Sequence, residues 1–491
     1  MNTNKNQFIS QQVIEDVCEW EIMHGVAFRQ DDNTARHVPF SIAPITMERP
    51  VYSHLLAVTP LIAKLVSNVS EDHEFLQESL RDMAKADPFF GRLIELHQQA
   101  HGDVSQSDEA ARQSLLLMRT DFMDDRQHGA KVIEFNGIAA GMGPFGQRAT
   151  ELHRFVKDQW NDVYNTWLED DSAVPADNQA LEQLAHGIAT ATNKVKMHFS
   201  ALDDENDQQK PTFLMIVQKG EDNVYDQHLL EVALQNRGVR TVRRTFEQLS
   251  TQLSSGENKR LILNGVGTID TVYLRAGYQY SDYWAPDLNE PICCHTLSQT
   301  RLFIEKHYVA MNATISQQLA TSKSMQMLLT MMPAEDYARW GLTLEEAQLV
   351  KSVLADMKPI SKEIIEWFNS STDKKEWVLK NQGEGGGHCV FGEDISDTLT
   401  KLKPEEYDAW ALMQRLYPHE RDTPTIAIRD GQQTLVKDLV SEIGLFTAHY
   451  QGDAVTELGG YAGYLIRSKP ASENEGGIHS GQGILDSLVL I

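Results

Sequence analysis

The chain has 491 residues, of which 41% are hydrophobic and 23% are charged. This length and composition are typical of a globular protein with two to four domains and ample cores. It carries 44 basic and 70 acidic residues, and the formal net charge of −26 repels nucleic acid and anionic membranes, so that an anionic substrate must meet locally clustered Lys and Arg.

Neither a leader nor a metal or disulfide framework is indicated. Residues 1–29 lack the apolar segment of a signal peptide, and no run approaches the roughly 18 apolar residues of a membrane helix. The cysteines follow no zinc-ligand or disulfide spacing, so we expect reduced thiols. They are Cys18, Cys293, Cys294 and Cys389. These features predict a cytoplasmic protein without nucleic-acid or membrane partners.

The first 200 residues are expected to be mostly helical, because segments such as 53–66 repeat apolar residues at a helical period. Two strands interrupt this pattern. The first, 114–123, is predicted to deliver Arg119 at its end, and the second, 131–136, runs into a loop of small residues that reaches Gly143.

Glu134 and Asn136 share one face of the second strand, since side chains alternate along a strand, while Ile133 and Phe135 share the other. A carboxylate and an amide oxygen are hard ligands that suit Mg²⁺. Taken alone, the pattern favours an ordinary amphipathic strand with one solvated face.

An alternating α/β pattern follows the polar stretches 168–178 and 202–210, which indicate boundaries or surface loops. Strands are predicted at 212–217, 239–243, 260–263 and 271–275, with a helix at 226–237 that Gly238 closes. We therefore expect a small parallel sheet, with ligands at the carboxyl ends of its strands, near loops 221–227 and 275–278. Arg275 can bind a substrate carboxylate or form a surface salt bridge, and the sequence leaves both open.

Helices resume from 300 to 370 and carry Lys323, and a hairpin follows at 377–394. Its first strand ends at Lys380, its turn holds four glycines and Glu384, and apolar residues return at Val390. A loop without Cβ atoms lets backbone N–H groups converge on phosphate oxygens, while the lysine adds a positive charge.

Glu384 has the wrong sign for a phosphate contact unless Mg²⁺ lies between them. A flexible glycine linker is the alternative, but it would need no flanking strands. The spacing fits neither a Walker A loop nor G-x-G-x-x-G. It favours a glycine-rich lid of the kind that ATP-grasp ligases use.

The chain is predicted to consist of three regions, 1–208, 209–318 and 319–491, and the C-terminal part belongs to the third. Segment 410–416 is a strand candidate for an adenine slot, and 439–446 is a strand or a short helix. Arg467 and Lys469 would face the same side of a strand, which favours an anion between them. A second glycine-rich loop follows, and His479 is interpreted as a loop residue rather than a general base.

Eight stretches, in the family's order, resemble the eukaryotic-type glutathione synthase family, a circularly permuted branch of the ATP-grasp ligases. They are Met-Arg-Thr-Asp-Phe-Met at 118–123, Ile-Glu-Phe-Asn at 133–136, Tyr-Asp-Gln at 225–227, Leu-Arg-Ala-Gly-Tyr at 274–278, the Lys323 segment, the hairpin from Lys380 to Glu393, Ser-Glu-Ile-Gly at 441–444, and Arg-Ser-Lys to Gly-Gly at 467–477. The resemblance implies an ATP-grasp α/β fold with a glycine-rich lid hairpin, a small parallel-sheet substrate domain and a helical N-terminal region.

The resemblance also implies ATP-dependent joining of γ-glutamylcysteine to glycine through an acyl phosphate. Mg²⁺ would be held by Glu134, Asn136 and Glu384. ATP would be enclosed by Glu134, Lys323, Lys380, Gln382, Glu384, Gly385, Gly386, Gly387, Phe391, Met413, Gln414, Arg415, Leu416, Glu442, Lys469 and Glu475. The peptide and its acceptor would be bound by Arg119, Ile138, Ala139, Ala140, Gly141, Glu221, Asn223, Gln227, Arg275, Tyr278, Arg467, Ile478 and His479. Arg467 and Lys380 would be the catalytic residues, and a homodimer is the usual assembly.

Several positions depart from the family pattern. Ala139 and Gly141 replace serines that often contact the γ-glutamyl end, and Ile478, His479 and Ser480 replace an alanine-rich loop that closes on glycine. Gln414 and Phe391 replace an acidic residue and a tyrosine near the nucleotide. The alternatives are the same ligase chemistry with β-alanine or serine as acceptor, a nucleotide-binding regulatory protein without turnover, and a small-molecule kinase.

Overall fold

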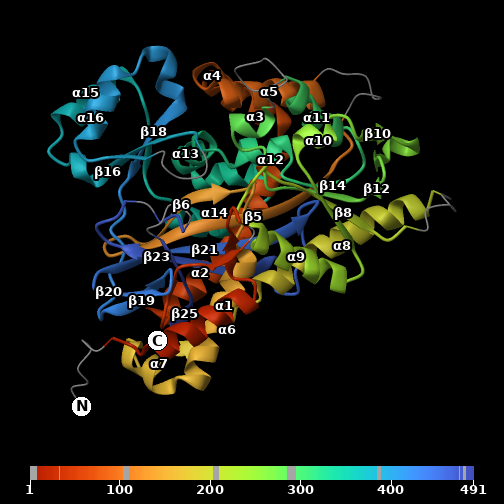
Figure 1. Cartoon of the computed structure of the whole chain (residues 1–491). Coiled ribbons are helices and arrows are strands. Elements are labelled where there is room, and N and C mark those ends of the chain that lie inside the picture. The colour runs from red at the N-terminus through yellow and green to blue at the C-terminus, as the bar shows by residue number, and fades with distance from the viewer. Residues whose placement is uncertain are drawn as a thin grey trace.

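One 13-stranded sheet runs through the middle of the described chain, and helices cover both of its faces (Figure 1). The computed structural model describes residues 8–32, 34–102, 110–202, 209–284, 295–383, 389–474, 476–478 and 483–491. The strand order is β20-β19-β3-β24-β23-β21-β5-β14-β13-β8-β9, with β22 paired to β21 and β6 paired to β5. The expected mixed α/β class is confirmed.

The helices of the described ranges are as follows. They are α1 Gln11–Met23, α2 Arg49–Ser70, α3 His73–Ser79, α4 Arg81–Ala86, α5 Pro88–His101, α6 Gly143–Gln159, α7 Asn161–Trp167, α8 Ala180–Ser200, α9 Val224–Asn236, α10 Phe246–Leu249, α11 His295–Glu305, α12 Ile315–Ala320, α13 Lys323–Met331, α14 Leu344–Val353, α15 Lys362–Ser370 and α16 Asp394–Lys401.

The strands include those predicted near residues 114, 131, 212, 239, 271 and 410, with boundaries shifted by a few residues. They are β1 Ala27–Arg29, β2 Ala35–His37, β3 Phe40–Ser41, β4 Ile45–Met47, β5 Gln113–Asp125, β6 Gly129–Asn136, β7 Val174–Pro175, β8 Thr212–Ile216, β9 Arg240–Arg244, β10 Leu253–Ser255, β11 Leu261–Leu263, β12 Gly267–Ile269, β13 Thr271–Leu274, β14 Ala310–Asn312, β15 Met357–Pro359, β16 Trp377–Asn381, β17 Cys389–Phe391, β18 Trp410–Gln414, β19 Thr425–Arg429, β20 Gln432–Val436, β21 Leu439–Tyr450, β22 Asp453–Ala454, β23 Tyr461–Pro470, β24 Ile484–Asp486 and β25 Leu488–Leu490. Segment 439–446, predicted as a strand or a short helix, is a strand.

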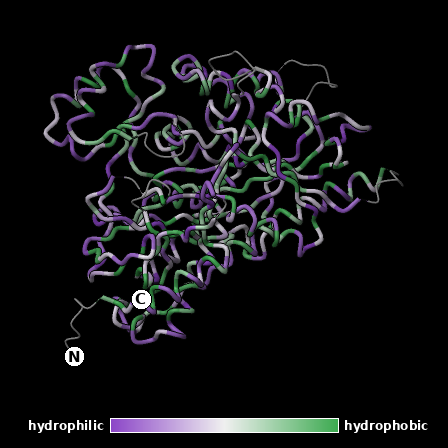
Figure 2. The backbone as a smooth tube through the Cα atoms, viewed as in Figure 1, coloured by the Kyte–Doolittle hydropathy of each residue, from purple (hydrophilic) through white to green (hydrophobic). Residues whose placement is uncertain are grey.

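The central sheet separates two hydrophobic cores, because successive side chains of a strand point to opposite faces. Leu116 of β5 and Leu214 of β8 lie in one core, whereas their neighbours Leu115 and Phe213 lie in the other. Helix α2 packs on the first face and α8 on the second. Figure 2 shows hydrophilic and hydrophobic residues alternating along the outer helices, as expected for helices with one buried side.

The predicted parallel unit is present, with one correction. β9, β8, β13, β14 and β5 pair in parallel. The predicted strand near 260 is β11, and it pairs antiparallel with β10 and β12 in a separate three-stranded sheet. The reason is the short connection after β11, where Gly265 has a φ of +75°. Such a turn makes a hairpin, and a parallel crossover needs a dozen or more residues.

Helix α2 corrects the expectation that no segment is apolar enough to cross a membrane. Among the described residues it passes that test by length and mean hydropathy. Polar residues such as Lys64 interrupt it, so a count of uninterrupted apolar residues missed it. Leu55, Val58 and Ile62 of this helix are fully buried in the first core, and α2 packs against β21 and β5. It is therefore a core helix of this fold.

The long strand β5 places Arg119 differently from the prediction. Arg119 lies in the middle of β5 rather than at its end, opposite Asn136 of β6 and Phe446 of β21. The pairing of β5 with β6 shifts register after Asp121, so that Asp121 is opposite Glu134 and Phe122 is opposite Val132. Residue 133 is the extra residue of this bulge, which re-aims side chains locally.

The predicted hairpin forms part of a second, four-stranded sheet in the order β15-β18-β16-β17, at the upper left of Figure 1. β16 and β17 are antiparallel, with Lys380 opposite Cys389. One face of this lid sheet packs Leu379 and Leu412 in a separate small core under α15 and α16. The other face packs Met413 against Met327 of α13.

We predict that Gly146→Ala in α6 destabilises the protein. Alanine normally stabilises a helix relative to glycine by about 1 kcal/mol. Here a Cβ at Gly146 would lie 2.1 Å from the carbonyl oxygen of Tyr464 in β23. We therefore expect a loss of about 1–3 kcal/mol in the free energy of unfolding, measured by urea denaturation. Arg154→Ala, on the exposed side of the same helix, is the control. Equal stability of the two variants would contradict the packing argument.

Candidate active site

A cavity of about 650 Å³ lies between the lid sheet and strands β5, β6, β21 and β23. Its size suits a small-molecule substrate with a nucleotide. It brings together the following residues that the sequence predicted as ligand-binding: Arg119, Glu134, Asn136, Ile138, Ala139, Gly141, Glu221, Asn223, Arg275, Tyr278, Lys323, Lys380, Phe391, Met413, Gln414, Arg415, Leu416, Glu442, Arg467, Lys469 and Ile478.

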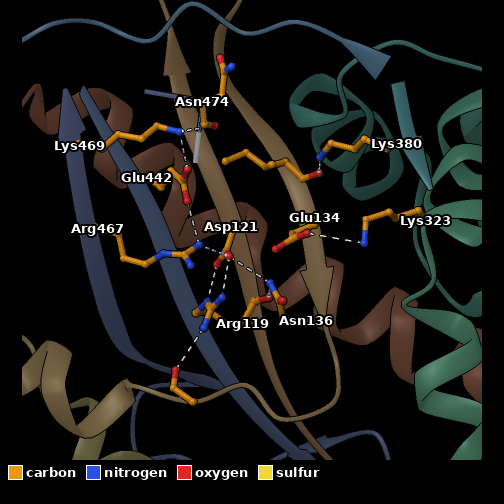
Figure 3. Close-up of polar contacts among 12 residues, drawn as sticks. Arg119, Asp121, Glu134, Asn136, Lys323, Lys380, Glu442, Arg467, Lys469 and Asn474 are labelled. Atoms are coloured by element: carbon orange, nitrogen blue, oxygen red, sulfur yellow. Dashed lines mark hydrogen bonds and ion pairs between the residues drawn. The ribbon is translucent and has the colours of Figure 1, made fainter. Parts of the chain in front are cut away.

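Asp121 lies at the centre of the charged groups of the cavity (Figure 3). Its Oδ1 accepts a hydrogen bond of 2.6 Å from Nε of Arg119, and its Oδ2 accepts one of 2.8 Å from Nη2 of the same residue. Oδ2 also accepts a bond of 2.9 Å from Nη2 of Arg467 and one of 3.1 Å from Nδ2 of Asn136. Asp121 is 1% exposed, so these charge-assisted bonds replace its water.

Glu134 is surrounded by cations. Its Oε2 lies 3.9 Å from Nζ of Lys323, which also donates a hydrogen bond of 2.8 Å to the carbonyl oxygen of Gly383. Nζ of Lys380 donates a bond of 3.2 Å to the carbonyl oxygen of Ile133. Burial raises the pKa of Glu134, but the neighbouring lysines and arginines outweigh it and hold that pKa at about 2. Glu134 is therefore ionised at neutral pH.

Glu442 lies between the two cations of β23. Its Oε2 is 2.9 Å from Nη2 of Arg467, and its Oε1 is 3.3 Å from Nζ of Lys469. Burial raises the pKa of Glu442, but Arg467 and Lys469 lower it below its usual value. Lys469 also donates to the carbonyl oxygen of Asn474 at 2.9 Å. The sequence predicted an anion between Arg467 and Lys469, and the protein supplies one of its own.

A second group of charges surrounds Arg275 at the other end of the cavity. Nη1 of Arg275 donates a bond of 2.8 Å to Oδ2 of Asp226, and Nη2 lies 3.7 Å from Oε1 of Glu221. Arg275 is 6% exposed, which rules out the surface salt bridge. Burial lowers the pKa of Arg275, but the negative charge of Asp226 outweighs this effect and raises the pKa above its usual value. Burial raises the pKa of Glu221.

Gly141 joins the two groups of charges. Its carbonyl oxygen accepts a hydrogen bond of 3.2 Å from Nη1 of Arg119. A Cβ at this position would lie 2.6 Å from Nη2 of Arg275. The absence of a side chain therefore allows Arg275 to approach the backbone, and a serine here would push it away.

Three predicted residues do not line the cavity. Gln382 is fully buried and holds the start of α13, since its Oε1 accepts a bond of 3.1 Å from N of Ser324. Gln227 donates to Oε2 of Glu221 at 2.7 Å and accepts from Arg243, so it supports the site from behind. Ala140 packs in the second core. Which side of its strand, loop or helix each residue faces decided these positions, and motif spacing does not reveal this side.

Six predicted residues lie outside the described residues. These are Glu384, Gly385, Gly386, Gly387, Glu475 and His479.

Asp121 and Asp226 were not among the site residues predicted from the sequence, although each holds an arginine of the site. The signal for Asp121 was available, because residues two apart share one side of a strand, and Arg119 and Asp121 are two apart. Asp226 lies in the predicted ligand loop 221–227, and its Oδ2 also accepts a bond of 3.0 Å from N of Met142.

The residues of β6 fit a hard divalent cation. Glu134 offers an ionised carboxylate. Asn136 uses its Nδ2 for Asp121, which leaves its amide oxygen as the remaining ligand atom. Carboxylate and amide oxygens are the ligands that Mg²⁺ takes together with substrate phosphates.

Comparisons with known proteins identify the family of the chain. The family model of the eukaryotic glutathione synthase, ATP binding domain, matches residues 7–490. The glutathione synthetase large chain of Schizosaccharomyces pombe is 29% identical, over 96% of each chain. The human glutathione synthetase is 28% identical, over 92% of this chain and 90% of its own length.

A solved structure with a similar fold is the apo form of a glutathione synthetase-like effector from Globodera pallida, with a TM-score of 0.69, 18% identity and 99% coverage of both chains. Because the family model matches nearly the whole chain, the protein belongs to the eukaryotic glutathione synthase family.

Proposed function

We propose that this protein joins γ-glutamylcysteine to glycine at the expense of ATP and releases glutathione, ADP and phosphate. The observation that carries the proposal is the single cavity in which Arg119, Glu134, Lys380, Arg275 and Arg467 meet. ATP would phosphorylate the cysteinyl carboxylate, the glycine amine would attack the acyl phosphate, and phosphate would leave. The protein then has to position two anions and stabilise the charge that passes between them.

ATP is assigned to the part of the cavity under the lid sheet. Met413 and Leu416 offer an apolar surface for the adenine, and Arg415 lies over the ring of Phe391 at 5.5 Å. Lys323 and Lys380 supply positive charge for the phosphates, with Lys469 near Glu442 at the opposite wall. The glycine-rich tip, Glu384 to Gly387, and Glu475 are assigned to the same substrate on the family resemblance alone.

Mg²⁺ is assigned to Glu134 and Asn136, with Glu384 as a third ligand from the lid. When bound, it would neutralise charge on the phosphates. Glu134 stays ionised beside four cations, and Asn136 is oriented by Asp121. Both residues are thus ready to bind a cation without rearrangement.

The γ-glutamylcysteine is assigned to the end of the cavity around Arg275. Ion-paired Arg275 and carboxylate Glu221 can recognise the carboxylate and ammonium groups of a γ-glutamyl head, with Asn223 and Tyr278 beside them. Ile138, Ala139 and Gly141 then contribute backbone rather than hydroxyl groups. Arg119 and Arg467 lie between the two ends, where the reacting carboxylate meets the phosphate, and Arg467 is the catalytic cation together with Lys380.

We further propose that the protein is a cytoplasmic homodimer without membrane or nucleic-acid partners, and that its three regions are 1–208, 209–318 and 319–491. The charge of −26 supports the absence of nucleic acid. The central sheet takes strands from all three regions, so the boundaries separate functional regions rather than independently packed domains.

Replacing Glu134 by Gln should remove most of the Mg²⁺-dependent formation of ADP. The change removes the negative charge of a partly buried side chain that lies among four cations, while the shape is kept. We expect kcat/KM for MgATP to fall by at least about 100-fold in a coupled ADP assay. Glu405→Gln, an exposed site with no ion pair among those described, is the control. Unchanged activity of the Glu134 variant would contradict its role as a metal ligand, whereas no ADP formation by the wild type would favour the regulatory alternative.

Replacing Asp121 by Asn should weaken both stability and turnover. Buried Arg119 and partly buried Arg467 would lose their shared carboxylate, and the loss of one partner of a buried ion pair typically costs about 3–5 kcal/mol in the free energy of unfolding. Displacement of Arg467 should lower kcat by about 10²–10³. Denaturant unfolding and steady-state kinetics check the two effects. The control is Asp158→Asn on the exposed side of α6, and a variant as stable and active as this control would refute the central role of Asp121.

An acceptor panel tests the substrate. With γ-glutamylcysteine and MgATP present, ADP release should require glycine, and β-alanine or serine should support it poorly. Strict dependence of ADP release on β-alanine or serine would identify that amino acid, rather than glycine, as the acceptor. ADP release at full rate without any amine would indicate a kinase, because acyl-phosphate turnover needs the attacking amine.

A further inference from the structure

Three histidines form a cluster between α3 and α5 that the proposed reaction does not use. They are His73, at the start of α3, and His97 and His101, which are four residues apart and so lie on one side of α5. One ring nitrogen of each lies within 4.8 Å of a ring nitrogen of the others. Helices α3 and α5 lie at the top of Figure 1, apart from the strands β21 and β23 that line the cavity.

We propose that this cluster is a binding site for a divalent transition metal of the zinc class, separate from the magnesium site. Two nitrogen ligands of a tetrahedral zinc ion lie roughly 3.3 Å apart, given Zn–N bonds of about 2.0–2.1 Å. Nε2 of His97 and Nδ1 of His73 are 3.3 Å apart. Nε2 of His101 is buried and makes no hydrogen bond among the described residues.

The outer nitrogen atoms of two rings face groups that orient metal-bound histidines. Nε2 of His73 lies 3.9 Å from Oε2 of Glu71, and Nδ1 of His97 lies 3.1 Å from the amide of Gln77. A carboxylate or amide oxygen behind the ring fixes which nitrogen binds the metal. Turning the Gln77 amide by half a rotation would present its oxygen to an N–H at Nδ1 of His97.

The charges nearby also suit a cation. The positive charge of Arg112 acts on His97 and His101. Its Nη1 lies 2.9 Å from Oε2 of Glu71, and its Nε lies 3.8 Å from Oε2 of buried Glu305. Two carboxylates therefore more than offset the one guanidinium. Side chains of His73 and Glu71 are 29% and 38% exposed, which gives an ion a path from solvent and leaves room for water as a fourth ligand.

The rings must move to bind. The rings of His73 and His101 stack with their centroids 3.7 Å apart and an angle of 16° between their planes, whereas lone pairs that share one ion must converge. A rotation of the partly exposed His73 ring would suffice. The bound metal would then join α3 to α5, which packs on α12 just before Lys323.

The ligand chemistry separates this site from the catalytic one. Imidazole nitrogen favours zinc, cobalt, nickel and copper, while the oxygen ligands of β6 favour magnesium. Metal-stripped full-length protein would be titrated with Co²⁺ in excess Mg²⁺, and Co²⁺ would then be displaced by Zn²⁺. We expect one Co²⁺ per chain, with the strong visible absorption of a tetrahedral site, and a rise in the thermal unfolding midpoint with Zn²⁺.

His101→Gln and His73→Gln should each weaken Zn²⁺ binding by at least about 100-fold and remove the zinc-dependent rise in the midpoint, without changing the midpoint of the metal-free protein. His73→Gln changes a partly exposed residue, so its Zn²⁺ affinity can be measured even if the His101→Gln variant fails to fold. His128→Gln, at an exposed histidine elsewhere, should bind like the wild type. No tetrahedral Co²⁺ signal in the wild type, or equal binding by the cluster variants and the control, would overturn the proposal.

Discussion

Asp121 receives hydrogen bonds from Arg119 and Arg467, which reach it from β5 and β23 on either side of β21. A guanidinium removed from water without a partner is costly, so Asp121 stabilises Arg119 in the cavity and shares Arg467 with Glu442. Strand β21, which lies between β5 and β23, leaves space for the Arg119 side chain. Gly444 of β21 is opposite Asp121, and a Cβ at this glycine would lie 2.7 Å from Cδ of Arg119. The cations that meet substrate are therefore positioned before any substrate binds.

The same principle holds at both ends of the cavity. Glu442 holds Arg467 and Lys469, while Asp226 and Glu221 hold Arg275. Each cation is balanced by a carboxylate, which explains how a chain with a charge of −26 can present a site for anions. The acidic excess of the sequence is partly structural at this site, because several of its carboxylates position arginines and lysines rather than repel substrate.

The lid sheet has a core of its own, built by Leu379, Leu412 and their neighbours under α15 and α16. Its other face meets α13, whose first residue is Lys323. Lys323 and Lys380 reach Glu134 from these two elements, and they join the lid sheet to the central one through charge rather than through a shared apolar core. The histidine cluster lies at the other end of the same group of helices, since α5 packs on α12.

The sequence determined the local features of the protein: the strands that carry Glu134 and Arg467, the helical N-terminal part, the glycine-rich hairpin and most of the residues that line the cavity. These follow from periodicity, turn chemistry and motif order, which depend on near neighbours in the chain. Only the tertiary structure decided what each charge contacts. Glu442 lies between Arg467 and Lys469, Arg275 is buried against Asp226, and Gln382 turns away from the cavity. Pairing across strands and burial in a common cavity bring together residues that are far apart in sequence. No local sequence pattern therefore determines which of these residues come into contact.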